Sequence, residues 1–220
     1  MRKDDPLRKF TKKEPDSLAD VELLELLLRL TAEDSKDLAQ KIMEIYPGVP
    51  ALIEADPRDL ASIAGMDEKS LLLLRLLPEM QRRYFLSRNE KTKRLLSGPD
   101  YGRYLLPYYF GARDEIVYIL LLDAAGNVLN CRFMGQGTVG SANVPMRRLV
   151  QEALIANASG IVLAHNHPCG MAVPSKEDVE LTLRIRESLS ILELRLLDHI
   201  IVADDDFISL RESGYLQEEE

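Results

Sequence analysis

Two histidines and one aspartate stand at a spacing that suits metal binding. His165 and His167 are separated by one residue, and Asp178 follows after a segment containing proline and glycine. Two imidazoles and one carboxylate form a catalytic type of zinc ligand set, because three protein ligands leave one of four tetrahedral positions for water. A metal bound in this way polarises a substrate carbonyl and activates water. The spacing therefore predicts a hydrolytic zinc site.

A strand is expected to lead into the two histidines. The apolar run at residues 159–164 contains a glycine near its start and predicts a buried strand that ends just before His165. Side chains alternate along a strand, so His165 and His167 should point to one side and Asn166 to the other. Two imidazoles can therefore converge on one ion at the end of this strand.

A helix is expected to carry the aspartate. Prolines and a glycine within residues 168–174 predict a loop, and a helical pattern follows to about Ser190. Asp178 then lies in the first helical turn. Ser175 and Asp178 also have a structural alternative as an N-cap pair, in which the serine oxygen accepts a hydrogen bond from a helix N–H. The whole set is more specific than its members, since the chain contains only three histidines.

These residues resemble a known metalloprotease motif. The pattern begins with His165-x-His167, continues after seven residues with Ser175, and ends after two more residues with Asp178. It is similar to the JAMM (MPN-plus) motif, and its context resembles the RadC-like (UPF0758-type) branch. The resemblance covers most of the chain and includes the segments 115–123, 137–138, 152–154 with 157–158, and 197–202. It implies an α/β fold of MPN/JAMM type, with a mixed sheet and flanking helices as in cytidine deaminases. A small all-α domain similar to a helix-hairpin-helix would precede it.

The resemblance also implies a role for each residue. In the JAMM family a glutamate at the start of the first core strand polarises the attacking water, and by position this is Glu115. Peptide or isopeptide hydrolysis needs a base for the water and an acid for the leaving amine, and one carboxylate can serve as both. By the same likeness Ser175 would stabilise the oxyanion, while His165, His167 and Asp178 would bind Zn²⁺. Without the likeness, Glu115 would be interpreted as a solvated acid.

The chain departs from the family pattern at two places. RadC-like chains usually have His-Pro-Arg-Glu where this chain has Pro145-Met146-Arg147-Arg148. Two polar or ionisable residues of the family pattern are thus replaced, which predicts altered specificity or weaker activity if they contribute to substrate binding. Cys169 replaces the usual serine and is interpreted as a small hydrophobic replacement. His199 is expected to be structural, although Asp198-His199 could serve the site through a hydrogen bond.

The chain is expected to divide near residue 95 into a helical domain (1–95) and a hydrolase domain (98–215). In the first part, helices are expected at 21–30, 34–46, from Pro57 and at 71–88, with a capping box at 17–20. In the second part, a helix at about 99–110 precedes strands at 115–123 and 128–138, which are joined by a glycine-containing hairpin connection. A helix at 146–158 and a strand within 191–202 complete the expected elements.

The helical domain and the RadC-like resemblance suggest an alternative function, which is a non-catalytic role associated with DNA repair or with nucleic-acid binding. A helix-hairpin-helix presents the backbone N–H groups of a Gly-x-Gly turn to phosphate. This chain keeps Gly65 but has Asp67 at the second position, which makes a poor phosphate cradle. A basic segment with Arg82, Arg83 and Arg88 is more typical of a solvated helix face. The chain has a net charge of −8 and a pI of about 5.1, so strong duplex binding is not expected.

Composition favours a cytoplasmic enzyme without a membrane partner. The chain has 220 residues with 46% hydrophobic content, which is enough for one or two domains with a core. No segment reaches the roughly 18 apolar residues of a membrane span, and the first ten residues lack a secretory type of apolar stretch. Cys131 and Cys169 form no disulfide pattern. A protein or peptide substrate is the expected partner, and its identity and the oligomeric state are not predicted.

Overall fold

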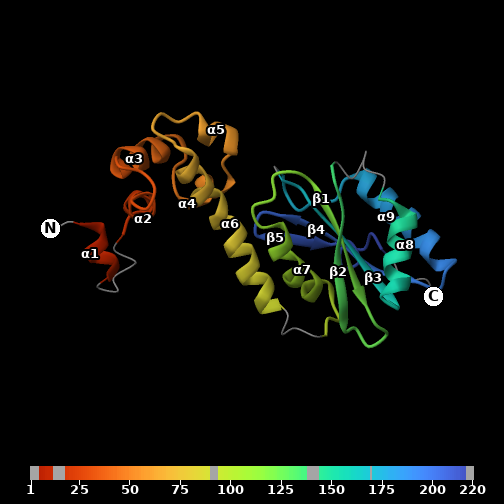
Figure 1. Cartoon of the computed structure of the whole chain (residues 1–220). Helices are drawn as coiled ribbons and strands as arrows, with labels where there is room; N and C mark the ends of the chain where they lie inside the picture. Colours follow the sequence, from red (N-terminus) through yellow and green to blue (C-terminus); the bar gives the residue numbers. More distant parts are fainter. Residues whose placement is uncertain (1–4, 12–17, 90–93, 138–143, 169, 217–220) are drawn as a thin grey trace. The chain divides into compact units, whose positions relative to one another are not determined.

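The computed structural model of the chain describes residues 5–11, 18–89, 94–137, 144–168 and 170–216 (Figure 1). The chain forms two compact units, Met1–Gln81 and Arg82–Glu220, with the boundary inside a long helix. The division into functional domains at residues 95–98 stays a prediction. Within the described ranges, no helix combines the length and apolar character needed to cross a membrane.

The first unit consists of helices packed around a leucine-rich core. Its elements are α1 (Pro6–Thr11), α2 (Asp20–Leu28), α3 (Ser35–Ile45), α4 (Val49–Glu54), α5 (Pro57–Ala61) and the first part of α6 (Glu68–Asn89). Leu28 and Ile42 are fully buried in this core. The predicted start of α5 is confirmed, because the Asp56 side chain accepts a hydrogen bond from the Arg58 N–H at 2.7 Å.

Two predictions for this unit concern the residues at which helices begin. The prediction of a capping box at residues 17–20 is wrong, because α2 begins at Asp20 with Ala19 as its N-cap residue. The Ala19 N–H donates instead to the Glu22 side chain at 3.1 Å, and Ser17 lies outside the described residues. In the turn before α6, Asp67 accepts a hydrogen bond from the Ser70 N–H at 2.7 Å and so caps the helix. The likeness to a helix-hairpin-helix stays a prediction.

The second unit contains a five-stranded mixed sheet in the order β2-β1-β3-β4-β5. The strands are β1 (Ile116–Leu122), β2 (Val128–Gln136), β3 (Gly160–Asn166), β4 (Arg195–Ala203) and β5 (Asp206–Ser209). β3 and β4 are parallel, and the other neighbours are antiparallel. The helices are α7 (Gly98–Leu105), the 3₁₀ helix η2 (Leu106–Tyr109), α8 (Met146–Ile155) and α9 (Lys176–Ser190). This mixed α/β architecture is consistent with a JAB/MPN-like fold, whereas the comparison with deaminases stays a prediction.

Most predicted elements of this unit are confirmed, with corrections at their ends. The β1–β2 hairpin and the helix ending at Ser190 occur as expected. The strand expected to end before His165 continues through it to Asn166. The helix expected to reach residue 110 stops at Leu105 and continues as a 3₁₀ turn. Residues 191–194 form a turn and not a strand, since Glu193 has φ +56°.

The two faces of the sheet are covered by different helices (Figure 1). α8 and α9 pack on one face, where they share a core with Ile119, Leu163 and Ile201. α7 and η2 pack on the other face, against residues such as Leu120 and Val162. Because side chains alternate along a strand, His165 lies on the same face as Leu163 and therefore toward α9.

A bulge in β4 changes which side chains face α9. Leu196 pairs with Ile161 and Asp198 pairs with Val162, so Leu197 is an extra residue in the ladder. The Leu197 side chain packs against Gly160, where a Cβ atom would lie 2.5 Å from Leu197 Cδ1. Beyond the bulge the alternation is reversed. His199, and not Asp198, therefore lies on the α9 face beside β3.

Candidate metal centre

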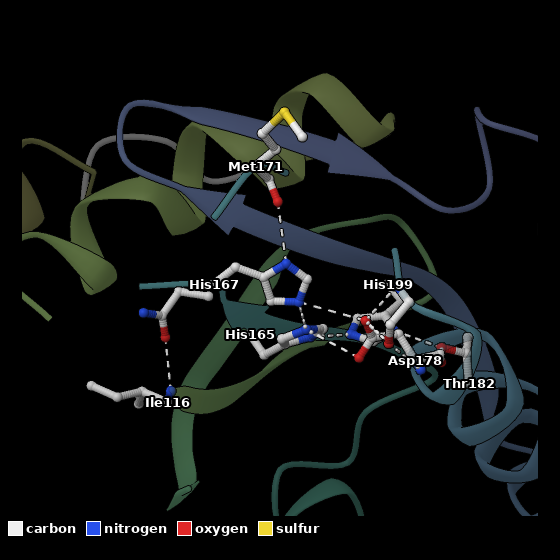
Figure 2. A network of polar contacts seen from close by, with 9 residues as sticks. Ile116, His165, His167, Met171, Asp178, Thr182 and His199 are labelled. Carbon is white, nitrogen blue, oxygen red and sulfur yellow. Dashed lines mark hydrogen bonds and ion pairs between the residues drawn. The ribbon is translucent and has the colours of Figure 1, made fainter. Parts of the chain in front are cut away.

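His165, His167 and Asp178 converge where β3 ends and α9 begins (Figure 2). The Nε2 atoms of the two histidines are 3.0 Å apart. His165 Nε2 lies 3.2 Å from Asp178 Oδ1, and His167 Nε2 lies 3.5 Å from Asp178 Oδ2. One ligand atom from each residue lies within 4.8 Å of the other two. The predicted convergence is therefore confirmed, and the group could bind a metal ion.

The secondary structure fixes both sides of this cluster. The backbone of His165 is paired with Val117 in β1 and with Ile201 in β4. At the start of α9, the Asp178 N–H donates to Ser175 Oγ at 3.1 Å and the Ser175 N–H donates to Asp178 Oδ2 at 2.8 Å. This is a reciprocal capping box. The N-cap interpretation is confirmed, and the same contacts hold the Asp178 carboxylate beside the histidines.

The cluster is buried on one side and open on the other. His165 is 0% exposed and Asp178 is 2% exposed, whereas 24% of the His167 side chain is accessible. Burial by itself would raise the pKa of the Asp178 carboxyl, but the nearby His165 ring and the hydrogen bonds from Ser175 hold that pKa well below its usual range. The carboxylate is therefore ionised, as a metal ligand must be.

The second ring nitrogen of each histidine also has a partner. His167 Nδ1 lies 3.2 Å from the carbonyl oxygen of Met171, and His165 Nδ1 lies 2.8 Å from His199 Nε2 (Figure 2). His199 thus contacts the site through a hydrogen bond, which is the alternative that the sequence left open. Burial lowers the pKa of His199 far below its ordinary value.

Thr182 is a site neighbour that the sequence did not indicate. Its Oγ1 atom donates to the carbonyl oxygen of Asp178 at 2.5 Å and lies 2.6 Å from Nδ1 of His199. The spacing of four residues from Asp178, which places two side chains on the same helix face, was the available signal. The Asp198 carboxylate accepts from the His199 N–H at 2.7 Å, and also from the Ser209 hydroxyl at 2.5 Å and the Arg211 N–H at 3.1 Å.

Asn166 ties the histidine strand to the segment around Glu115. Its Oδ1 accepts from the Ile116 N–H at 2.7 Å, and its Nδ2 donates to the Asp114 carbonyl at 3.2 Å. The Glu115 carbonyl accepts from the Gly137 N–H at 2.8 Å. The backbone of Glu115 is therefore held between β2 and the end of β3. The assignment of Glu115 as the catalytic carboxylate stays a proposal.

The departure at residues 145–148 has a structural counterpart. Arg148, at the position of the family's glutamate, donates to the carbonyl oxygens of Phe133 at 2.9 Å and Met134 at 3.2 Å. Both residues lie in β2, which is an edge strand of the sheet. Met134 is the extra residue of a bulge in β2, because Gly135 pairs with Val117 and Phe133 pairs with Tyr118. This arginine therefore joins α8 to the bulged part of β2. Cys169, the second departure, lies outside the described residues.

Comparison with known proteins agrees with the motif. Residues 97–215 match the family described as RadC-like JAB domain. The chain is 34% identical over 217 residues to a UPF0758 protein of Cellvibrio japonicus, covering 96% of this chain and 95% of the relative. It is also 34% identical over 213 residues to a UPF0758 protein of Azotobacter vinelandii, with the same coverage. The resemblance seen in the sequence is thus confirmed, and the chain belongs to the RadC-like JAB domain family.

Proposed function

We propose that this protein is a zinc-dependent hydrolase of JAMM type that cleaves a peptide or isopeptide bond. The main support is the convergence of two imidazole nitrogens and one ionised carboxylate at a site that is open beside His167. Nitrogen and oxygen donors of this number suit a catalytic zinc ion. Membership of the RadC-like JAB family is compatible with metal-dependent hydrolysis.

His165, His167 and Asp178 would hold the zinc ion. When bound, zinc would supply a Lewis acid for the substrate carbonyl and lower the pKa of a water molecule. The residues around it would bind the substrate and move the protons. The open side at His167 is the direction from which a substrate can enter, because His165 and Asp178 are covered by the protein.

Glu115 is proposed as the general base and acid. The β1–β3 ladder pairs Val117 with His165, and continuing that antiparallel register by two residues sets Glu115 opposite His167. Paired residues lie on the same face, so the Glu115 side chain would project toward the α9 side of the sheet. There its carboxylate would take a proton from the attacking water and return it to the leaving amine.

Ser175 is proposed to stabilise the oxyanion. Its hydroxyl now donates to Asp178 Oδ2 at 2.6 Å, and the residue is exposed. The oxyanion role requires this hydrogen to turn from Asp178 toward the substrate oxygen. The Ser175 oxygen would still accept from the Asp178 N–H during that rotation. One such donor can contribute about 10²- to 10³-fold in rate.

Elemental analysis of protein purified without chelator tests the metal centre. We expect about one zinc per chain, in keeping with a single three-ligand site, and its loss in Asp178→Ala. Glu177→Ala is the matched control, because Glu177 is an exposed carboxylate next to the ligand on the same helix. A chain without zinc even after zinc is added back would contradict the proposal.

Hydrolysis of fluorogenic peptide and lysine-isopeptide libraries tests the reaction. Glu115→Gln should keep its zinc and lower the cleavage rate by about 10²- to 10⁴-fold, since it removes the proton-transfer group without changing the side-chain shape. Glu177→Gln should cleave as the wild type does. Full activity of a zinc-loaded Glu115→Gln variant would exclude Glu115 as the base.

A further inference from the structure

Each proposed histidine ligand has a partner on the ring nitrogen that points away from the cluster. For His167 this partner is the Met171 carbonyl, which can only accept, so Nδ1 carries the hydrogen and Nε2 presents its lone pair. For His165 the partner is Nε2 of another histidine, His199, at 2.8 Å. A neutral His165 can bind a metal through Nε2 only if its own Nδ1 is the donor in this contact.

The hydroxyl of Thr182 determines whether His165 or His199 donates in the hydrogen bond between them. Its oxygen lies 2.5 Å from the carbonyl oxygen of Asp178 and 2.6 Å from Nδ1 of His199 (Figure 2). A carbonyl oxygen cannot donate, and the hydroxyl has a single hydrogen, so this hydrogen lies between Thr182 and Asp178. The contact between Thr182 and His199 then requires the hydrogen on Nδ1 of His199.

The position of the hydrogen on His199 determines the position of the hydrogen on His165. A neutral His199 with its hydrogen on Nδ1 has a lone pair on Nε2, so His165 must donate from Nδ1. The lone pairs of His165 Nε2 and His167 Nε2 are then both directed at the cluster, 3.0 Å apart, an arrangement that needs a cation or a proton between them. A charged His199 is disfavoured, because its ring is 0% exposed and both ring nitrogens contact groups other than carboxylates.

We propose that His199 and Thr182 are positioning residues that hold His165 in the tautomer able to bind a metal through Nε2. The inference rests on the proposed metal centre and adds two residues to it. Hydrogen bonds run without a gap from the Asp178 backbone through Thr182 and His199 to His165, so they join the ligand of α9 to the ligand of β3. Partners of this kind typically change metal affinity about 10- to 100-fold.

Nitrogen-15 NMR of the histidine rings tests the tautomer directly. The full-length chain has only three histidines, so long-range ¹H–¹⁵N spectra can be assigned with a His199→Gln variant. We expect His199 to carry its hydrogen on Nδ1 and a lone pair on Nε2, both with and without zinc. A hydrogen on Nε2 of His199, alone or together with one on Nδ1, would overturn the inference.

Zinc affinity, measured by competition with a chromophoric chelator, tests the consequence. Thr182→Val keeps the side-chain shape but removes the hydroxyl, and it should weaken zinc binding by about 10- to 100-fold. Thr182→Ser keeps the hydroxyl and should bind zinc almost as the wild type does. Ser70→Ala is a control for the loss of a buried hydroxyl, because it removes a hydrogen bond to Thr31 in the helical unit and involves none of these contacts.

The outcomes separate this inference from the proposed function. If the wild type binds zinc but Thr182→Val and Thr182→Ser bind it equally well, the positioning role is wrong and the metal centre stands. If the wild type binds no zinc, the proposed function fails, and the inference fails with it. Should Thr182→Val not fold, the NMR spectrum of the wild type still decides the tautomer.

Discussion

The Oδ1 atom of Asn166 accepts a hydrogen bond from the backbone N–H of Ile116 at 2.7 Å. Asn166 separates the two proposed histidine ligands in the chain and points to the opposite face of β3. Its Nδ2 atom donates to the Asp114 carbonyl, so one amide holds the backbone on both sides of Glu115. The strand that presents the proposed metal ligands therefore also positions the segment of the proposed base.

Replacing Asn166 should reduce catalysis more than metal binding. Asn166→Ala removes both contacts around Glu115, and a displaced catalytic group can cost on the order of 10- to 100-fold in kcat. Asn166→Asp keeps the acceptor for Ile116 and should have an intermediate effect. The measurement is kcat on a substrate selected from the peptide libraries, together with zinc content. An unchanged kcat in Asn166→Ala would argue against the role of this amide.

Replacing Ser175 should affect stability and catalysis separately. Ser175→Ala removes the N-cap of α9 and should lower the free energy of unfolding by about 1 kcal/mol. Ser175→Thr keeps a hydroxyl and should be close to the wild type in stability. Urea unfolding of the zinc-free proteins measures this difference. If Ser175→Ala is less stable but has the kcat of the wild type, Ser175 is a cap and does not stabilise the oxyanion.

Arg148 should contribute to stability through its contacts with β2. Arg148→Ala leaves the carbonyls of Phe133 and Met134 without this donor and should lower the free energy of unfolding by about 1 kcal/mol. Arg147→Ala is the matched control, because Arg147 is a neighbouring exposed arginine on the same helix. Equal urea midpoints for the two variants would show that the contact between Arg148 and β2 contributes nothing measurable.

Cys131 should be an unreactive thiol at neutral pH. Burial raises its pKa to about 12, and a hydrogen bond with Tyr108 only partly offsets this. Only the thiolate reacts, so the alkylation rate should still rise with pH at about pH 10 and not level off near 8.5, the ordinary thiol pKa. The experiment uses Cys169→Ser, in which Cys131 is the single cysteine. The urea-unfolded chain is the control and should level off, whereas a plateau in the folded protein would contradict the burial argument.

The sequence determined the local elements and the identity of the proposed ligands. Alternation and helical spacing depend on neighbouring residues, so β3, α9 and the capping pair Ser175 and Asp178 could be recognised without knowledge of the fold. The family resemblance added Glu115, which no local pattern distinguishes from a solvated acid. The ends of elements were less predictable, as shown by residues 191–194, where hydrophobic residues form a turn.

The tertiary structure alone decided which residues surround the ligands. Simple alternation from Leu196 would place Asp198 on the α9 face, but the bulge at Leu197 brings His199 there instead. Gly160, on the neighbouring strand, provides the space for the Leu197 side chain. Such contacts join residues that are more than thirty positions apart, and they depend on strand register and packing between elements. Sequence periodicity carries no information on either, because it records only which side of its own element a residue occupies.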